Sequence, residues 1–354
     1  MNKKKQFCHN EKCENYGLRD KDNIIIHSKK EKRYKCKDCG KTFSQTKGTV
    51  FYNKQHNMDT IKLVVGLSAF GCPIQAIVFA FDIDERTVMA WLQASGEHCK
   101  RVHEAQILKP KELKHVQSDE MYVKGFKKKF WMAFSICAET RLWLGGYVSQ
   151  KRDGILISKV VALIKLIAIK GNLLIATDGF SSYKTAILKA FREKILTGKR
   201  GRPKLKVWES LNYVQVIKNR IGNRILEIKK EVVTGSLEVV EKIITKTKTG
   251  NTINTAYIER INSTFRSRMS FSTRRSRCLL RNEKKLENMM YLVGTFYNFC
   301  TPHKSLSNKK NKMTPAMKYQ IADKIWSSEE LLNFKISMND LNYKKIQTIG
   351  EKSS

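Results

Sequence analysis

Two close pairs of cysteines near the amino terminus constrain this chain more than any other feature. Cys8 and Cys13 are separated by four residues, and Cys36 and Cys39 by two. Two such pairs of thiolates can complete a tetrahedral zinc shell, and Gly40 allows the tight turn behind the second pair. About 40 polar residues bury too little apolar surface to fold alone, so the metal would hold them together. The spacing therefore predicts a structural Zn²⁺ site with Cys8, Cys13, Cys36 and Cys39 as ligands.

The segment between the two cysteine pairs favours a β-hairpin. It carries three consecutive isoleucines at residues 24–26, and isoleucine is enriched in strands. A hairpin between two cysteine pairs is typical of a zinc ribbon, which we assign to residues 1–52. His9 or His27 can replace one cysteine as a ligand, although a single histidine near a ribbon is more often a surface residue.

The net charge indicates a polyanionic partner. The chain has 354 residues, enough for two or three domains, and 41% of them are hydrophobic. Its 68 Lys and Arg against 32 Asp and Glu give a formal net charge of +36, which destabilises a compact protein unless a polyanion offsets it. Each DNA phosphate that Lys or Arg neutralises releases a condensed counterion. We therefore expect double-stranded DNA as the partner.

The sequence gives no sign of a secreted or membrane protein. Residues 1–5 lead to the first cysteines without the apolar stretch of a secretory signal. The longest apolar run, residues 155–169, is too short to span a bilayer and contains Lys159 and Lys165. Nine cysteines, four of them with metal-ligand spacing, are typical of a reducing compartment. We expect a cytoplasmic, nucleoid-associated protein without a membrane partner.

A block of helices follows the cysteines. Capping and breaking residues predict helices over residues 59–70, 74–81 and 85 to about 98. The third helix would bury an apolar stripe and present small polar side chains outward. Two short helices, a tight turn and such a third helix are typical of a helix-turn-helix, which we assign to residues 53–105. The side chains expected to contact DNA are Arg86, Thr87 and Gln93.

The pattern changes after Pro110 to that of an α/β domain. Expected strands cover residues 114–123, 130–137 and 142–149, followed by a helix over 155–170, a strand over 173–178 and a helix over 182–191. Three antiparallel strands followed by a helix, a strand and a helix form the opening order of an RNase H-like sheet. We therefore expect an RNase H-like core over residues 106–320, with a mixed five-stranded sheet and flanking helices.

Two acids fall where this sheet would bring them together. Asp119 lies inside the first strand and Asp178 at the end of the fourth, and those strands would pair in parallel. Carboxylates that are pressed together repel each other, so they share a proton or hold a divalent cation. The neighbouring Glu120 should point to the opposite face of its strand, and we do not expect it to take part.

A helix packed across the sheet can donate a third acid. Asn254 or Thr255 can begin this helix. Its expected buried stripe consists of Ile258, Ile261, Phe265 and Met269. Glu259, Asn262 and Arg266 fall on a neighbouring face and would point together toward the two strand acids.

These segments resemble the three acidic motifs of bacterial and archaeal insertion-sequence transposases of the DDE class. The matching segments read QSDE at residues 117–120, TDG at 177–179 and IERINSTFR at 258–266. That family often has a basic residue seven positions after its Glu, where Arg266 stands. Two later segments are also similar to these enzymes, YNFCTPHKSL at residues 297–306 and MTPA at 313–316. The resemblance covers residues 8–320, nearly the whole chain.

The resemblance implies an enzyme that cuts and joins DNA strands. Asp119, Asp178 and Glu259 would bind two Mg²⁺ or Mn²⁺ ions, of which one activates water or a 3′-hydroxyl and the other stabilises the leaving oxygen. Asn262 and Arg266 would contact DNA. Such an enzyme binds the terminal repeats of its own element and joins them to target DNA. Because two ends must be cut in concert, we expect a homodimer or larger homo-oligomer on DNA.

Simpler interpretations of the same residues stay open. An isolated Asp before Gly, such as Asp178, is usually a turn residue, and an isolated Glu on a helix, such as Glu259, usually faces solvent. His303 either contacts a phosphate or braces a helix end. Alternative functions are an RNase H-like nuclease and a non-catalytic DNA-binding regulator derived from a transposase. The order and context of the three acids favour the transposase.

The 80 residues between the second and third acids exceed what the core requires, so we expect an insertion at about residues 195–250. Its basic run reads KRGRPK at residues 199–204, and Arg200 and Arg202 can enter a narrow minor groove of DNA. A solvated basic loop is an equally good interpretation.

Two further segments are less informative. Residues 213–218 and 224–233 predict a β-hairpin that either includes the fifth strand of the sheet or covers the DNA channel. Residues 321–354 form a polar C-terminal tail to which no role is assigned.

Overall fold

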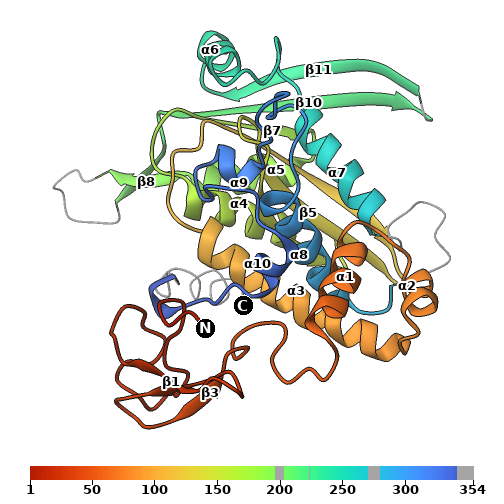
Figure 1. Cartoon of the computed structure of the whole chain (residues 1–354). Coiled ribbons are helices and arrows are strands. Elements are labelled where there is room, and N and C mark those ends of the chain that lie inside the picture. Colours follow the sequence, from red (N-terminus) through yellow and green to blue (C-terminus); the bar gives the residue numbers. More distant parts are fainter. Residues whose placement is uncertain (196–202, 223, 270–279, 341–354) are drawn as a thin grey trace.

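The computed structural model describes residues 1–195, 203–222, 224–269 and 280–340. A six-stranded mixed sheet forms the centre, helices cover it, and a small three-stranded sheet lies to one side (Figure 1). The chain is therefore a mixed α/β protein, as its sequence predicts.

The central sheet has the strand order β11-β10-β7-β4-β5-β6. Its strands are β4 (His115–Lys124), β5 (Lys129–Cys137), β6 (Leu142–Ser149), β7 (Leu173–Asp178), β10 (Leu211–Ile221) and β11 (Arg224–Thr234). β4, β5 and β6 pair antiparallel, and β7 pairs in parallel with β4. The three antiparallel strands and the parallel fourth strand that the sequence predicts are thus confirmed.

The expected number of five strands is wrong, because the β10–β11 hairpin contributes two strands to the sheet. β10 pairs in parallel with β7, with Leu211 opposite Leu173 and Val216 opposite Asp178. β11 then pairs antiparallel with β10 and forms the sheet edge. Beyond Val216 the hairpin continues past β7 as an arm (Figure 1). The hairpin therefore includes the fifth strand and adds a sixth.

Helices pack against both faces of the sheet. They are α4 (Gly154–Ile167), α5 (Ser181–Ala190), α6 (Leu237–Thr247), α7 (Ala256–Arg268) and α8 (Glu283–Phe299). Successive strand residues point to opposite faces. On β5, Phe134 packs against Phe265 of α7, whereas Ala133 lies in the apolar cluster of α4 and α5. The side chains of α7 and α8 thus fill one layer, and those of α4 and α5 the other.

α4 ends three residues before its predicted end at residue 170. Lys111 pairs with Ala168, donates to the Ile167 carbonyl at 2.8 Å and accepts from the Ile169 N–H at 3.0 Å. This pairing draws the chain out of the helix before residue 170. The residue that ends the helix, Lys111, lies 57 positions before Ala168 in the sequence, so a pattern of neighbouring residues could not predict where the helix ends.

Three helices precede the sheet: α1 (Met58–Ala69), α2 (Ile74–Phe81) and α3 (Glu85–Ile107). Asp84 caps α3 as predicted, since its side chain accepts from the Arg86 N–H at 2.9 Å. The expected end of α3 near residue 98 is wrong, because its second half continues along α8. The buried side chains of α1 and α3 share one apolar cluster with those of β5, α7 and α8.

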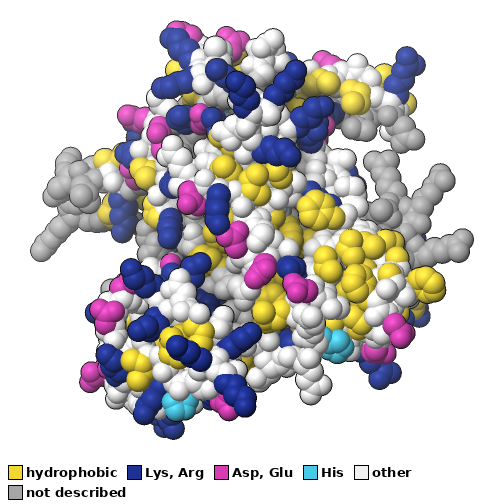
Figure 2. Space-filling model, viewed as in Figure 1, with side chains coloured by type: hydrophobic (Ala, Val, Ile, Leu, Met, Phe, Trp, Pro, Cys, Tyr) yellow, Lys and Arg dark blue, Asp and Glu magenta, His cyan; other side chains and the backbone are white. Residues whose placement is uncertain are grey.

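α2 is unusual in that it is apolar while most of its side chains are exposed. Only Ile77 is buried, and Phe79 is 91% exposed. With Leu63, Leu67 and Phe70 of the adjoining segment, Phe79 accounts for the apolar patch over α1 and α2 in Figure 2. Contiguous apolar surface of this kind is typical of contact surfaces.

The N-terminal sheet consists of β1 (Ile24–Ser28), β2 (Arg33–Cys36) and β3 (Thr42–Ser44), all antiparallel. The predicted hairpin is confirmed as β1–β2. Tyr34 and Phe43 stack with their ring centroids 5.9 Å apart and form, with Ile24 and the cysteines, a very small apolar cluster. A core of this size needs a further cross-link, such as a metal ion.

Two strands border the basic run, β8 (Arg192–Ile195) and β9 (Lys204–Val207), and they pair antiparallel. Arg200 and Arg202 lie outside the described residues. Within the described ranges, no helix combines the length and apolar character needed to cross a membrane.

The C-terminal segment connects the small sheet to the rest of the molecule. It contains α9 (Pro315–Lys318), α10 (Ser328–Leu332) and a 3₁₀ turn (Met338–Asp340). Leu331 and Leu332 are buried in the cluster of α1 and α3. The Lys335 ammonium donates to Gln6 at 2.7 Å, and the Met338 N–H donates to the Gly17 carbonyl at 2.8 Å. Residues 331–340 thus have a structural role that the sequence did not suggest.

Candidate functional site

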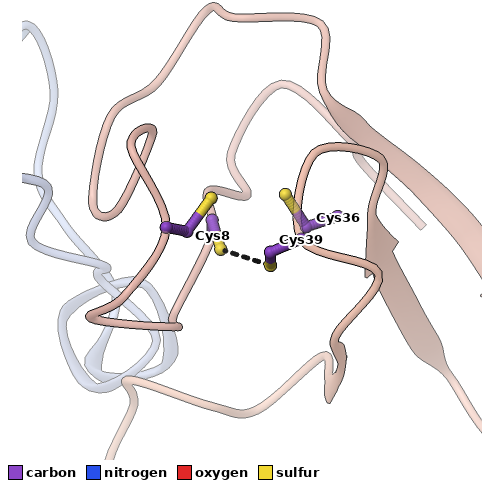
Figure 3. Close-up of side chains that lie close together, drawn as sticks. Cys8, Cys36 and Cys39 are labelled. Atoms are coloured by element: carbon purple, nitrogen blue, oxygen red, sulfur yellow. Dashed lines mark hydrogen bonds between the residues drawn. The ribbon is translucent and has the colours of Figure 1, made fainter.

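The four N-terminal cysteines come together as their spacing predicts. One sulfur atom from each lies within 4.8 Å of the others. Figure 3 shows Cys8, Cys36 and Cys39 close together, and the Sγ atoms of Cys8 and Cys39 are 3.6 Å apart. Four sulfurs at about 2.3 Å from a tetrahedral zinc ion are separated from each other by roughly 3.8 Å. The donor set therefore fits zinc.

Hydrogen bonds to sulfur favour the thiolate form that a metal requires. The backbone N–H of Asn10 donates to Cys8 Sγ at 3.4 Å, and the Asn23 amide donates to Cys36 Sγ at 3.6 Å. The side-chain hydrogen bond of Asn10 is the largest cause that lowers the pKa of Cys39 to about 6. Burial raises the pKa of Cys8. A bound cation would offset that effect.

Among the described residues, the metal-ligating group contains neither nearby histidine. His27 is exposed, as a surface residue would be. His9 instead packs between the rings of Phe7 and Phe43, with centroid distances of 4.7 and 5.0 Å. Burial lowers the pKa of His9 to about 3, so it is a neutral packing residue.

A second cluster lies where β4 and β7 run side by side. Ser118 is opposite Thr177 in the parallel pair, so the next residues, Asp119 and Asp178, are neighbours. One carboxylate oxygen each from Asp119, Glu120 and Asp178 lies within 4.8 Å of the others. The predicted proximity of Asp119 and Asp178 is confirmed, and three oxygens at this spacing fit a hard divalent cation.

Asp119 is the most perturbed acid of this cluster. Burial, followed by the charges of Glu120 and Asp178, raises the pKa of Asp119 to about 7. Its Oδ2 accepts from the Asn262 amide at 2.7 Å, and its Oδ1 accepts from the Glu120 N–H at 2.8 Å. Near neutral pH, Asp119 therefore holds a proton part of the time unless a cation offsets the repulsion.

Glu120 belongs to the cluster, and the expectation that strand alternation would keep it away is wrong. Its side chain is fully buried and accepts from the Tyr183 hydroxyl of α5 at 3.0 Å. This contact does lie on the opposite side of β4 from Asn262. The Asp119 carboxylate, however, folds back over its own strand toward the Glu120 N–H, so the two carboxylates still approach each other.

Arg152 joins two of the three carboxylates, and no motif pointed to it. It forms ion pairs with Glu120 and, at 3.3 Å, with Asp178. Its guanidinium lies 4.3 Å from the ring centroid of Phe180 and 5.3 Å from that of Trp131. These rings stabilise the cation in place. Arg152 follows β6 in a loop, where a single Arg gives no recognisable pattern.

Glu259 lies beside the cluster rather than in it. It forms an ion pair with Lys218 of β10 and accepts from the Thr255 hydroxyl at 2.7 Å, while its side chain stays 47% exposed. Its charge is the smallest contributor to the raised pKa of Asp119. Asn262, three residues later, does reach Asp119, so the predicted face of α7 is turned toward the strand acids. The predicted buried stripe of α7 is also confirmed.

Gln117, two residues before Asp119, fixes α7 on the sheet. Its side-chain oxygen accepts from the backbone N–H groups of Tyr257 and Ile258 at 3.0 and 3.1 Å. The first N–H groups of a helix have no partner within it, so this long-range cap replaces a local one. One strand segment thereby carries an acid and also positions the helix that carries Glu259.

The side chains expected to read DNA lie on α3. Arg86 and Gln93 are exposed and Thr87 is half-buried. Arg86 and Gln93 line a cavity of about 840 Å³ between α3 and the start of α8. The other cations lining this cavity are Arg268, Arg281 and Lys285. Arg266 is half-buried in the last turn of α7.

The motif after the third acid has a clear structural part. Asn298 accepts from the Trp143 N–H at 3.0 Å and donates to the Trp143 carbonyl at 2.8 Å, which fixes α8 to β6. Thr314 caps α9 through the Met317 N–H at 3.2 Å. His303 accepts from the Ser305 hydroxyl at 3.0 Å.

No family model matches the sequence, and no curated protein matches it either. The side chains and their geometry are thus what supports a function.

Proposed function

We propose that this protein is a DNA transposase of the DDE class, with an RNase H-like core, a zinc ribbon and a helix-turn-helix. The observation that carries the proposal is the pairing of Asp119 and Asp178 on adjacent parallel strands, beneath the face of α7 that holds Asn262 and Glu259. This is the arrangement that the three acidic motifs require.

The sheet supports the RNase H-like assignment. Five of its strands follow the order β6-β5-β4-β7-β10, in which three antiparallel strands are followed by two that add in parallel. β11 extends this arrangement at one edge. Asp119 and Asp178 belong to β4 and β7, the two middle strands of the six-stranded sheet, and Asn262 of α7 reaches Asp119 there.

Asp119, Asp178 and Glu259 are the proposed ligands of two Mg²⁺ or Mn²⁺ ions. Bound there, such ions supply activation of a nucleophilic oxygen and stabilisation of the leaving oxygen of a phosphodiester. Asn262 orients the Asp119 carboxylate through its 2.7 Å hydrogen bond. Glu259, which pairs with Lys218 in this structure, would hold an ion only after giving up that ion pair. Both carboxylate oxygens of Glu120 are engaged, so we assign it the positioning of Arg152.

The net charge of +36 supports DNA as the partner, both at the element ends and at the target. Arg86, Thr87 and Gln93 of α3 are the proposed base-reading side chains, and Arg266 contacts the backbone near the cut. The zinc site holds the ribbon together. Paired cleavage of two ends requires at least a dimer on DNA. We place this activity at the nucleoid, in the cytoplasm.

A strand-transfer assay tests the proposal. The substrate is a labelled duplex that ends in the inverted repeat flanking the gene, with its 3′-hydroxyl already exposed, and the target is a plasmid. We expect joining with Mg²⁺ or Mn²⁺ and its loss in Asp119→Asn and Asp178→Asn. Cutting without joining would indicate a nuclease. Binding to the repeat without either reaction would indicate a regulator.

A further inference from the structure

Arg141 is a buried cation whose guanidinium forms no ion pair with an acid among the residues that the structure describes. Its residue is only 9% exposed, and its Nε and Nη1 have no hydrogen-bond partner among the described residues. Burying a charged donor without a partner is unfavourable. The acid closest in sequence, Glu139, pairs with Lys114 at 3.4 Å instead. Two donors of the Arg141 guanidinium are therefore buried and without a hydrogen-bond partner among the described residues.

The surroundings hold Arg141 in place. Its guanidinium carbon lies 3.8 Å from the ring centroid of Tyr257 on α7, a cation–π contact. Its carbonyl accepts from the Tyr297 hydroxyl at 3.0 Å, and its backbone has a φ of 63°, which is uncommon for a residue with a side chain. Unfavourable backbone geometry that is fixed by neighbours is typical of binding positions.

Two more donors gather around Tyr297. The ring of His303 lies 6.2 Å from that of Tyr297, edge to face. Burial, followed by the charges of Arg141 and Arg260, lowers the pKa of His303 to about 4, so His303 is neutral at physiological pH. Its Nδ1 accepts from the Ser305 N–H at 3.3 Å, which leaves the proton on Nε2 as a donor. Arg260 is exposed on α7.

We propose that Arg141, Arg260 and His303 form a binding site for one phosphate group of the DNA backbone. Tyr257 and Arg260 lie on one flank of α7, three residues apart, whereas Glu259 and Asn262 face the acidic cluster. A strand that crosses α7 can therefore occupy both flanks, with one phosphate at Arg141 and another at the acids. The ligand rests on the proposed function, but the site itself rests on the unpaired guanidinium.

Salt-dependent binding of the full chain to a labelled random-sequence duplex tests this site. Each phosphate contact on B-DNA contributes about 0.9 to the slope of log K against log salt concentration, which is about eightfold in affinity at 0.1 M salt. We expect the double variant Arg141→Gln/Arg260→Gln to lower the slope by about 0.9 and to weaken binding about eightfold, and each single variant to produce part of that change. Lys170→Gln, which removes a cation already paired with Glu193, should change neither.

Three further measurements separate the outcomes. Arg141→Lys keeps the charge and should keep the slope, and Arg260→Gln decides the question if Arg141→Gln does not fold. Titration with inorganic phosphate distinguishes a free anion: tight phosphate binding lost in Arg141→Gln, with DNA binding unchanged, would overturn the proposal. Unchanged DNA slopes in both variants would overturn it as well. A wild-type protein that shows the expected slopes but joins no DNA ends would refute the transposase alone.

Discussion

The two candidate metal clusters differ in how the chain assembles them. The four cysteines all lie within residues 8–39, in and before a single small sheet, whereas Asp119 and Asp178 of the acidic cluster come from two strands and are 59 positions apart in the chain. Local spacing therefore encodes the first cluster, and strand pairing creates the second. A sequence motif identifies every residue of a cluster of the first kind. For a cluster of the second kind, it identifies some of the residues but not the others that lie beside them.

The clusters also differ in how their charge is balanced. Arg152 pairs with two of the three carboxylates and so offsets part of their charge, which lets the central sheet form before a divalent ion binds. The N-terminal sheet has a very small apolar cluster and four cysteines whose sulfur atoms a bound cation would hold together. We infer that metal is required for folding at the first cluster and for chemistry at the second.

Loss of zinc should have the largest effect of all. Structural zinc contributes roughly 10–16 kcal/mol of apparent binding free energy in small domains. Cys36→Ser should reduce the zinc content from one ion per chain to nearly none and expose residues 1–52 to protease, while the six-stranded central sheet stays intact. Metal analysis and limited proteolysis with mass spectrometry measure this. Cys72→Ser, a half-buried cysteine outside the cluster, is the control. Stoichiometric zinc in Cys36→Ser would remove the contrast between the clusters.

The next largest effect concerns catalysis at the acids. Asp119→Asn should slow strand joining roughly a thousandfold, equivalent to about 4 kcal/mol of transition-state stabilisation. The matched control is Asp82→Asn, because Asp82 is an exposed residue at a φ of 50° that Asn also tolerates. The rate of single-turnover joining is the measurement. Equal joining rates for Asp119→Asn and wild type would exclude Asp119 from the proposed catalytic ligands.

The dependence of stability on pH should reveal the burial of Asp119 and its repulsion by the neighbouring acids. The pKa of Asp119 rises from 3.8 to about 7 on folding, so its contribution to stability is complete below pH 4 and is lost as the pH rises through 7. Metal-free protein should therefore lose on the order of 2–4 kcal/mol from this group between pH 4 and pH 8. Urea unfolding at each pH measures it. Asp119→Asn should flatten the profile, and so should Mg²⁺ at pH 8. A profile that is identical in Asp119→Asn would show that folding does not raise the pKa of Asp119.

The smallest expected difference is between two glutamates. Glu259→Gln removes a proposed ligand, whereas Glu120→Gln removes only the partner of Arg152 and Tyr183. Loss of an outer partner costs about 10–100-fold in metal affinity or activity. We expect Glu120→Gln to lie at the lower end of that range and Glu259→Gln above it, measured as Mn²⁺ affinity and joining rate. The reverse order would make Glu120 the third ligand.

Sequence reasoning reached most of the fold but only part of the acidic site. Capping by Asp84 and the strand run of residues 173–178 depend on neighbouring residues, and both were predicted. The full length of α3, the end of α4 and the role of Arg152 depend on residues far away in the chain. The alternation of side chains along β4 led to the prediction that Glu120 lies outside the acidic cluster. Alternation gives the face to which a side chain points, but it does not give the conformation of the neighbouring Asp119 carboxylate.

The contacts between the ribbon and residues 331–340 have a consequence for the order of events during translation. Lys335 and Gln6 are 329 positions apart, which corresponds to roughly 16 to 66 seconds of elongation. Throughout that interval the nascent ribbon has no docking partner. It can bind its metal before it docks on the rest of the molecule. It takes its final orientation only when α10 and the following turn have left the ribosome.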